Sequence, residues 1–295
     1  MDIRQLKYFL AVAKHKSFTK ASQALHLSQP SISKMIKSLE DELGVTLIDR
    51  STKQIELTDA GEIVRKQAQQ IIHSIDDLAQ SLYDLMHLNK GHVTLGLPPI
   101  AGTIFFAPII EKLHRHYPGI QLELMEFGSK KVAQGIESGI LDVGIAMLPV
   151  DSCKFDVIPF VSEEMRLITH RRHPLAGKSV VSLSELKDES FIFLSEEFAL
   201  YERIWHECTK AGFKPKITYK SSQWDFIAEL VATGLGIAIF PQSLCAKLPT
   251  ERLRIIPINP AIPWNLGIIV KKHRYISYAA QTLINLIKNH RFNHN

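Results

Sequence analysis

The sequence predicts an α/β protein with an N-terminal winged helix-turn-helix, a long linker helix and a two-lobed, doubly wound α/β domain. Two short amphipathic stretches meet at a tight connection within residues 18–39, and an apolar heptad pattern free of proline follows from residue 59 to residue 89. Short strand-like and helix-like segments then alternate to the end of the chain. The expected domains are 1–58, 59–89 and 90–295, the last with one lobe near 90–160 and 267–295 and a second near 161–266.

Composition is that of a globular protein with a sizeable core. Hydrophobic residues make up 45% of the 295 residues and charged residues 22%. No segment approaches the roughly 20 apolar residues that cross a bilayer, and the N-terminus lacks the apolar run of a signal peptide. We therefore expect a cytoplasmic protein that has no membrane partner.

The cysteines and histidines do not predict a metal centre or a cofactor. Cys153, Cys208 and Cys245 are widely separated and form no CxxC pair, which favours structural thiols in a reducing compartment and leaves a redox role open. His114 and His116 lack nearby thiol or acidic companions. The sequence therefore predicts neither a metal site nor a bound cofactor.

A first helix is expected over residues 2–14, and the helix-turn-helix follows it. Ser28 is a capping residue, and Pro30 lies in the first turn, where a missing N–H group is tolerated. Ile32, Ile36 and Leu39 have the spacing of a buried face. The remaining positions are expected to face outward with donors for base edges and phosphates: Gln29, Ser31, Ser33, Lys34 and Lys37.

The charges of this segment support binding to double-stranded DNA. Seven Lys or Arg residues and no carboxylate lie between Ile3 and Leu39, and acidic residues resume at Glu40. Such segregation suits a polyanionic partner. The alternative is a solvated surface without a partner.

A small β-wing is expected after the recognition helix, which should end near Gly44. An extended arm reaches residue 50, residues 51–54 form a turn, and residues 55–57 return as a strand. Arg50, Thr52 and Lys53 fall near the tip, where they suit contacts with flanking phosphates.

The linker helix is expected to begin near Asp59, with Asp59 and Glu62 at the spacing of a capping box. About 30 residues at a rise of about 1.5 Å make a rod of roughly 45 Å. Its apolar heptad seam consists of Val64, Ala68, Ile71, Ile75, Leu78, Leu82 and Leu85. Pairing of this seam with a second copy predicts a dimer that reads two half-sites of a palindromic operator. The alternative is that the seam packs on the protein's own body.

The remainder predicts a mostly parallel sheet with helices on both faces, repeated before and after about residue 160. Strands are expected at 93–97, 120–126, 141–147, 166–169, 191–194, 216–220 and 237–240. Helices are expected at 103–117, 129–138, 198–211 and 224–233, with a terminal helix from about residue 275.

These residues carry a resemblance to the LysR-type transcriptional regulators along the whole chain. The matching phrases are FTKASQAL at 18–25, SQPSISK at 28–34, LEDELG at 39–44, LTDAG at 57–61, GILD at 139–142 and LVATGLGIAIFP at 230–241. The resemblance implies a linker-helix dimer, a two-lobed effector domain similar to periplasmic binding proteins, tetramers built from dimers, and contact with RNA polymerase. Phrases at 96–102 and 222–227 are similar to a Gram-positive subgroup that controls holin-like and overflow-metabolism genes in response to acetate or a related acid.

The same resemblance implies DNA contacts by particular residues. They are Gln29, Pro30, Ser31, Ser33, Lys34 and, in the wing, Arg50. Members of the family often have arginine where this chain has Lys34, and lysine lacks the planar fork that suits guanine. We therefore expect Lys34 to contact phosphate before base.

An effector site is expected between the lobes, at the carboxyl ends of strands. The candidate residues lie beside expected helix N-termini, where small organic acids are favoured: Gly102, Thr103, Ser129, Ser195, Ser222 and Gln223. Pro98 and Pro99 cannot donate from their backbone nitrogens, so binding at the first loop would depend on Gly102 and Thr103. The alternative is that each serine only caps its own helix.

An enzyme is not expected, and no catalytic residue is assigned. The chain has no GxSxG elbow, no P-loop and no GxGxxG after a strand, and its adjacent glutamates at 163–164 and 196–197 point apart. The sequence therefore predicts a sequence-specific transcriptional regulator controlled by a small-molecule effector. The alternative function is an architectural DNA-binding protein without ligand control.

Overall fold

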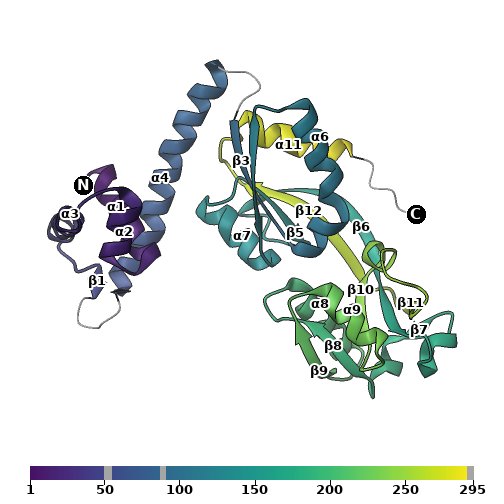
Figure 1. Ribbon diagram of the computed structural model, residues 1–295. Helices are drawn as coiled ribbons and strands as arrows, with labels where there is room; N and C mark the ends of the chain where they lie inside the picture. The colour runs from purple at the N-terminus through teal and green to yellow at the C-terminus, as the bar shows by residue number, and fades with distance from the viewer. Residues whose placement is uncertain (50–54, 87–90, 291–295) are drawn as a thin grey trace. The chain divides into compact units, whose positions relative to one another are not determined.

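The computed structural model describes residues 1–49, 55–86 and 91–290. Arg50, Thr52 and Lys53, expected at the wing tip, lie outside these residues. The chain forms two compact units, the first being Met1–Met86 with Ser138–Ile140 and the second the remainder. Figure 1 shows their elements, and each unit is described by itself.

The first unit contains the expected winged helix-turn-helix. Its elements are α1 (Ile3–His15), α2 (Phe18–Leu25), α3 (Gln29–Leu43), β1 (Ile48–Asp49), β2 (Glu56–Leu57) and α4 (Asp59–Met86). Phe9, Ile32, Ile36 and Leu39 are fully buried together in its core. The β1 and β2 strands pair antiparallel, which confirms a wing after α3. Gly44 ends α3 in a left-handed conformation at φ 69°, which a residue without a side chain adopts most easily.

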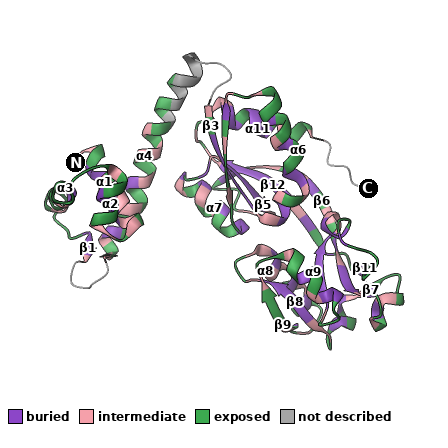
Figure 2. Cartoon of the chain, viewed as in Figure 1, coloured by how far each residue is buried: buried purple, intermediate pink, exposed green. Residues whose placement is uncertain are grey.

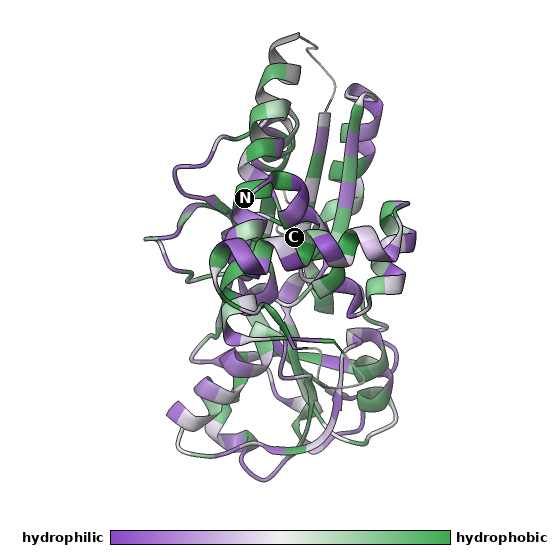
Figure 3. Cartoon of the chain, turned by 90° about the vertical axis from the view of Figure 1, so that its left-hand side faces the viewer, coloured by the Kyte–Doolittle hydropathy of each residue, from purple (hydrophilic) through white to green (hydrophobic). Residues whose placement is uncertain are grey.

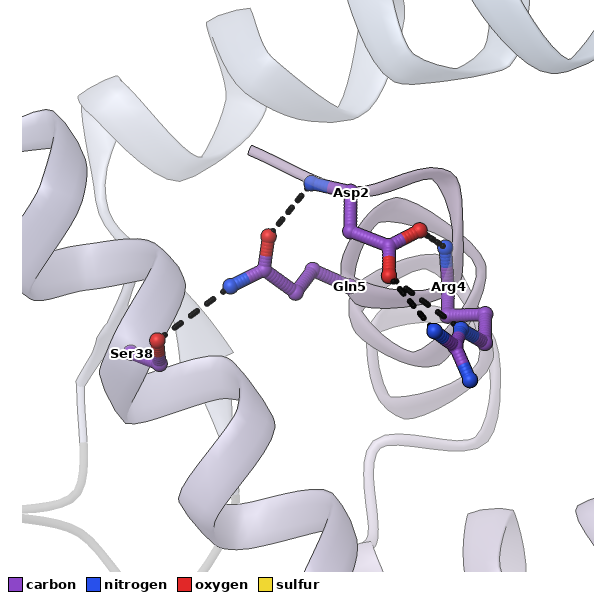
Figure 4. A network of polar contacts seen from close by, with 4 residues as sticks. All are labelled: Asp2, Arg4, Gln5 and Ser38. Carbon is purple, nitrogen blue, oxygen red and sulfur yellow. Dashed lines mark hydrogen bonds and ion pairs between the residues drawn. The ribbon is translucent and has the colours of Figure 1, made fainter.

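A polar network joins the start of α1 to α3 (Figure 4). The Asp2 carboxylate accepts from the Arg4 backbone N–H at 3.0 Å, and the Gln5 side-chain oxygen accepts from the Asp2 N–H at 2.6 Å. The Gln5 amide then donates to Ser38 Oγ at 3.3 Å. Gln5 is only 6% exposed, so its two polar atoms need these partners. The network therefore caps α1 and attaches it to the recognition helix.

The cap of α4 differs from the expected one. The Asp59 and Glu62 capping-box expectation is wrong, because the helix begins one residue earlier than such a box requires and Asp59 is already helical. Thr58 is the capping residue: its Oγ1 accepts from the Gly61 N–H at 3.0 Å and donates to the Thr46 carbonyl at 2.7 Å. One threonine hydroxyl thus joins the wing to the start of α4.

The N-terminal part of the expected dimer seam has a different role. Ala68 is 1% exposed, and Val64 packs against the winged-helix core, so these two side chains are buried in their own domain. Farther along α4, Ile71, Leu78 and Leu82 are 38%, 62% and 54% exposed. Figure 3 shows hydrophobic and hydrophilic segments alternating along this helix. The unpartnered apolar stripe therefore begins near Ile71, and the Leu85 side chain lies outside the description.

The second unit has a central mixed sheet in the order β4-β3-β5-β12-β6-β11-β7, with β10 also paired to β6. The strands are β3 (Gly91–Leu97), β4 (Ile120–Glu126), β5 (Val143–Met147), β6 (Phe155–His170), β7 (Val181–Ser182), β8 (Ser190–Leu194), β9 (Lys216–Ser221), β10 (Ala238–Pro241), β11 (Leu253–Asn259) and β12 (Pro263–Lys271). A separate parallel pair, β8-β9, joins this region through a bridge between Phe191 and Ile237.

The expectation of a mostly parallel sheet is wrong at its centre. The long strands β6 and β12 pair antiparallel with each other, and β6 also pairs antiparallel with β10 and β11. Among the described strands, the parallel pairs are β3-β4, β3-β5, β7-β11 and β8-β9. β7, β11, β12 and the first half of β6 are not among the expected strands. Pro159 interrupts the apolar residues of β6 and Pro257 those of β11, whereas Pro263 is only the first residue of β12.

The helices cover two lobes joined by β6. They are α5 (Pro99–Ala101), the π-helical segment η1 (Gly102–Phe106), α6 (Ala107–His116), α7 (Ser129–Ser138), the 3-10 turns η2 (Pro174–Gly177) and η3 (Leu183–Leu186), α8 (Ala199–Lys210), α9 (Trp224–Ala232), α10 (Gln242–Cys245) and α11 (Tyr278–Asn289). We call β3–β5, α5–α7 and α11 the first lobe, and β7–β11 and α8–α10 the second lobe. Figure 2 shows buried strands inside and exposed helix faces outside.

The helix expected over 103–117 is corrected at its start. Helical structure begins at Pro99 and passes through the π segment before α6. Gly102 and Thr103 therefore lie inside a helix rather than in the loop before one. In contrast, α7 spans the residues expected for it, Ser129–Ser138.

Candidate functional site

The outer face of α3 is the candidate nucleic-acid surface. Ser28 Oγ accepts from the Ser31 N–H at 3.3 Å, and Pro30 lies in the first turn, so the helix begins as expected. Because Ile32, Ile36 and Leu39 point into the core, the intervening positions face outward. Gln29, Pro30, Ser31, Lys34 and Lys37 are exposed, and Ser33 is half-buried.

The lysines of this face, Lys34 and Lys37, are not neutralised by carboxylates in the described part of the first unit. Arg4 pairs with Asp2 at 3.1 Å, which partly neutralises the N-terminal end of α1. No carboxylate among residues 1–49 and 55–86 forms an ion pair with Lys34 or Lys37. These two ammonium groups are thus available to phosphates.

Thr19 on α2 was not expected to matter, yet it contacts the end of Gln29. Its hydroxyl donates to Gln29 Oε1 at 3.5 Å, a long hydrogen bond. The contact occupies one lone pair of the Gln29 amide oxygen, so the oxygen can still accept a second hydrogen bond and the N–H₂ group can still donate. The threonine in the FTKASQAL phrase is the signal that sequence reasoning missed.

Glu40 is a second positioning residue that sequence reasoning missed. Its Oε1 accepts from the backbone N–H groups of Leu47 and Ile48 at 2.8 and 3.1 Å. Both residues are at most 1% exposed, so these N–H groups have little access to water. The end of α3 thereby sets the position of the first wing strand.

The second unit contains a pocket between its lobes. The first lobe contributes Pro98, Pro99, Ile100, Ser129 and Met147, the second lobe Leu194, Phe198, Ala199, Leu200, Ser222 and Trp224, and β12 contributes Trp264 and Leu266. The empty space measures about 470 Å³, including space open to solvent. Apart from the serines, the lining side chains are apolar, and no lysine, arginine, histidine or carboxylate is among them.

The two serines of the pocket come from opposite lobes. Ser129 is 8% exposed, and its Oγ accepts from the Met147 N–H at 3.1 Å, which leaves its hydroxyl hydrogen to donate elsewhere. The hydroxyl that accepts from the Gln223 N–H belongs to Ser221, and the Gln223 side chain makes no capping bond at α9. Ser129 and Ser222 are thus not occupied by capping α7 and α9.

The other four expected effector residues do not line this pocket. The Gly102 N–H donates to the Pro98 carbonyl at 3.0 Å, and Thr103 Oγ1 donates to the Pro99 carbonyl at 3.1 Å. Ser195 is engaged through its backbone with Ser221, and Gln223 is exposed outside the pocket. The earlier start of the helix at Pro99 explains the first two cases.

Two of the three thiols are buried. Burial raises the pKa of both Cys208 and Cys245 to about 12, which keeps them protonated at neutral pH. Cys153 is exposed. No group of three or more potential metal-ligating side chains occurs in the described part of the chain. Nor is any helix of that part long and apolar enough to cross a membrane.

Comparison with known proteins assigns the two parts of the chain to two family descriptions. The profile of the LysR substrate binding domain matches residues 87–291, and that of the bacterial regulatory helix-turn-helix protein, lysR family, matches residues 3–62. The uncharacterized HTH-type transcriptional regulator YwbI of Bacillus subtilis is 48% identical over 291 residues, which is 98% of this chain and 97% of the relative. The hydrogen peroxide-inducible genes activator of Dickeya chrysanthemi is 30% identical over 254 residues, covering 86% and 82%.

A solved structure extends the likeness to the whole fold. A full-length cysteine-to-aspartate variant of OxyR from Pseudomonas aeruginosa superposes with a TM-score of 0.76 at 26% identity, and the match covers 99% of this chain and 96% of that one. These relatives are regulators of transcription rather than enzymes, as the missing catalytic motifs predicted. With both domains matched, the chain belongs to the LysR family of transcriptional regulators.

Proposed function

We propose that this regulator is controlled by a small monocarboxylic acid, bound between its lobes, that changes how a dimer occupies its operator. The observation that carries the proposal is the pair Ser129 and Ser222, which line an otherwise apolar pocket from opposite lobes. A ligand that bonds to both hydroxyls stabilises one separation of the lobes over others, which is the requirement for a ligand-driven switch.

The pocket chemistry narrows the ligand class. Because no cationic side chain lines it, a carboxylate would rely on the serine hydroxyls and on the first-turn N–H groups of α7, which have no partner within the helix. The rest of the ligand would contact Phe198, Trp224 and Trp264, so it should be apolar. A second carboxylate would be buried without a partner, and we therefore expect dicarboxylates to bind poorly.

On the DNA side, we assign the α3 face to the major groove. Gln29, which is exposed and contacts Thr19 through its amide oxygen, suits an adenine edge, and Pro30, Ser31 and Ser33 follow it at the start of α3. Lys34 and Lys37 suit phosphates. Arg50, Thr52 and Lys53 of the wing are proposed to contact the flanking backbone.

Dimerisation is assigned to α4. Its exposed stripe at Ile71, Leu78 and Leu82, with Ile75 half-buried between them, keeps the heptad spacing that a second copy requires. A dimer doubles the DNA contacts of a small reading helix and selects paired half-sites. Tetramers and contact with RNA polymerase are implied by family resemblance and remain proposals.

Calorimetric titration of the full-length protein tests the ligand class. We expect butyrate to bind, succinate to bind at least about tenfold more weakly, and Ser129→Ala and Ser222→Ala to weaken butyrate binding. Ser195→Ala is the matched control, because Ser195 is outside the pocket. The operator footprint should change when butyrate is added. No binding of butyrate, or equal loss with the control, contradicts the ligand class, and a footprint unaffected by butyrate or related acids favours the architectural alternative.

A further inference from the structure

The two lobes touch at a point beside the pocket where only glycine fits. Gly128 is buried directly before α7, and a Cβ placed there would lie 2.1 Å from the Glu197 carbonyl oxygen and 3.5 Å from Phe198 Cα. Both obstacles are backbone atoms, which cannot rotate away. Gly128 does not have a left-handed φ, so glycine is needed here because a side chain has no space between the lobes, and not because of the backbone conformation.

Ion pairs surround this contact and also join one lobe to the other. Lys130 on α7 pairs with Glu202 on α8 at 2.5 Å, and Lys131 pairs with Glu197 at 3.5 Å. Nearby, the Arg203 guanidinium donates to the Leu148 carbonyl at 3.0 Å. The first turn of α7 is thus attached to the first turn of α8.

The same segments form the walls of the pocket. Ser129 directly follows Gly128, and Phe198, Ala199 and Leu200 directly follow Glu197. Any separation of Gly128 from Glu197 therefore moves the Ser129 wall away from the Phe198 wall. The distance between these walls determines whether one ligand reaches both.

We propose that the contact of Gly128 with the Glu197 carbonyl is the closing contact of the effector domain, and that the Lys130–Glu202 and Lys131–Glu197 pairs hold it closed. Gly128 is then a positioning residue for the pocket, which deepens the proposed function and rests on it for the ligand. The closed arrangement forms from the protein's own contacts before any ligand binds.

The strength of these contacts suits a reversible closure. All four side chains of the ion pairs are 46–62% exposed, so water and salt screen them. Exposed pairs of this kind shift an equilibrium by about 1.5- to 5-fold each. An added methyl group at Gly128 has no space in the closed form, and overpacking of this kind corresponds to a shift on the order of 10- to 100-fold.

Hydrogen exchange of the full-length protein without ligand tests the inference. In Gly128→Ala, amides of residues 128–134 and 194–202 should exchange on the order of 10- to 100-fold faster than in the parent. Gly177→Ala is the matched control, because a Cβ there meets open space without a left-handed φ. Unchanged exchange in Gly128→Ala overturns the closing contact.

Charge reversal provides a second, milder test that leaves the backbone intact. Lys130→Glu and Glu202→Lys should each speed exchange of the same segments, and the double exchange of charges should restore the parental rate. Failure of the double variant to restore that rate overturns the role of the ion pair.

Butyrate titration separates this inference from the proposed ligand. If Gly128→Ala speeds hydrogen exchange and weakens butyrate binding, the closing contact and the proposed ligand class are both supported. If exchange is faster but the parent does not bind butyrate, the closing contact stands and the ligand class is wrong.

Discussion

Removal of the Glu40 carboxylate should release the wing from the recognition helix. In Glu40→Ala, the Leu47 and Ile48 N–H groups lose their shared acceptor in a site where these residues are at most 1% exposed. A hydrogen bond to a charged group contributes about 1.5–3 kcal/mol. Two such bonds are lost, and water that enters the site and bonds to the N–H groups recovers part of this free energy. We therefore expect the wing to be destabilised by roughly 3 kcal/mol.

The variant Glu40→Gln removes the negative charge of the side chain but keeps an oxygen that can accept hydrogen bonds. Both bonds end on one oxygen, and the amide oxygen of glutamine can accept them, so we expect a loss of about 1 kcal/mol. Because the tryptophans at 205, 224 and 264 all lie outside the first unit, their fluorescence does not report its unfolding. Urea-dependent hydrogen exchange of residues 29–49 is the suitable assay.

Asp41→Ala is the control for this series, since Asp41 is exposed beside Glu40. We expect the wing to be destabilised most by Glu40→Ala, less by Glu40→Gln and least by Asp41→Ala, and the loss of DNA affinity to follow the same ranking. If Glu40→Ala and Asp41→Ala differ by less than about 0.5 kcal/mol, the carboxylate does not hold the wing and the reasoning is refuted.

Three further predictions concern the DNA face, the dimer and the thiols. Lys34→Ala should weaken binding to all sequences alike and lower the slope of log affinity against log salt by about one unit; a loss confined to one sequence would contradict a phosphate contact. Leu78→Asp places a charge in the exposed apolar stripe of α4 and should shift the protein toward monomers in analytical ultracentrifugation, whereas an unchanged mass would refute the seam. In the native protein at pH 8, iodoacetamide should modify Cys153 alone, and peroxide should form no Cys208–Cys245 disulfide, because burial raises the pKa of both of those thiols to about 12. Since this folded-state pKa lies above the ordinary value of 9.0, the free energy of unfolding should fall as the pH rises from about 9 to 12. Rapid labelling of all three thiols would contradict the burial of Cys208 and Cys245.

Much of the first unit was predictable because its signals are local. Ser28, Pro30 and the Ile32, Ile36 and Leu39 spacing define α3 by themselves, and the structure has these features. The wing was also predicted from local sequence, and its two strands pair as expected. The attachment of the wing to Glu40 was not predicted, because those bonds join Glu40 to residues seven and eight positions later.

The sheet shows where local patterns fail. Strand-helix alternation is typical of parallel sheets, but it does not reveal that β12 returns from the second lobe to lie antiparallel beside β5 and β6. Similarly, the heptad pattern of α4 is continuous, while its first positions pack on the domain that precedes it. Only the tertiary arrangement separates an internal contact from a free surface.

The candidate pocket was predicted in position and partly in composition. Ser129 and Ser222 lie in it, whereas Gly102 and Thr103 do not, because a proline at position 99 starts the helix early. The apolar walls, which include Trp224 and Trp264, were not predicted, because the candidate residues were chosen for their hydroxyl, amide and backbone N–H groups. The closing contact at Gly128 is likewise invisible in sequence, since its neighbour is the backbone carbonyl of a residue far along the chain.

Base-pair discrimination by the parent and by Gln29→Ala tests the central claim most directly. Genomic fragments retained by the full-length protein would first supply a binding site, and every base pair of that site would then be substituted in turn. If α3 reads the major groove, Gln29→Ala should lose discrimination at one position in each of two half-sites, by about 1–3 kcal/mol, and keep it elsewhere. Equal weakening at every position, or no retained fragment at modest salt, would contradict the account.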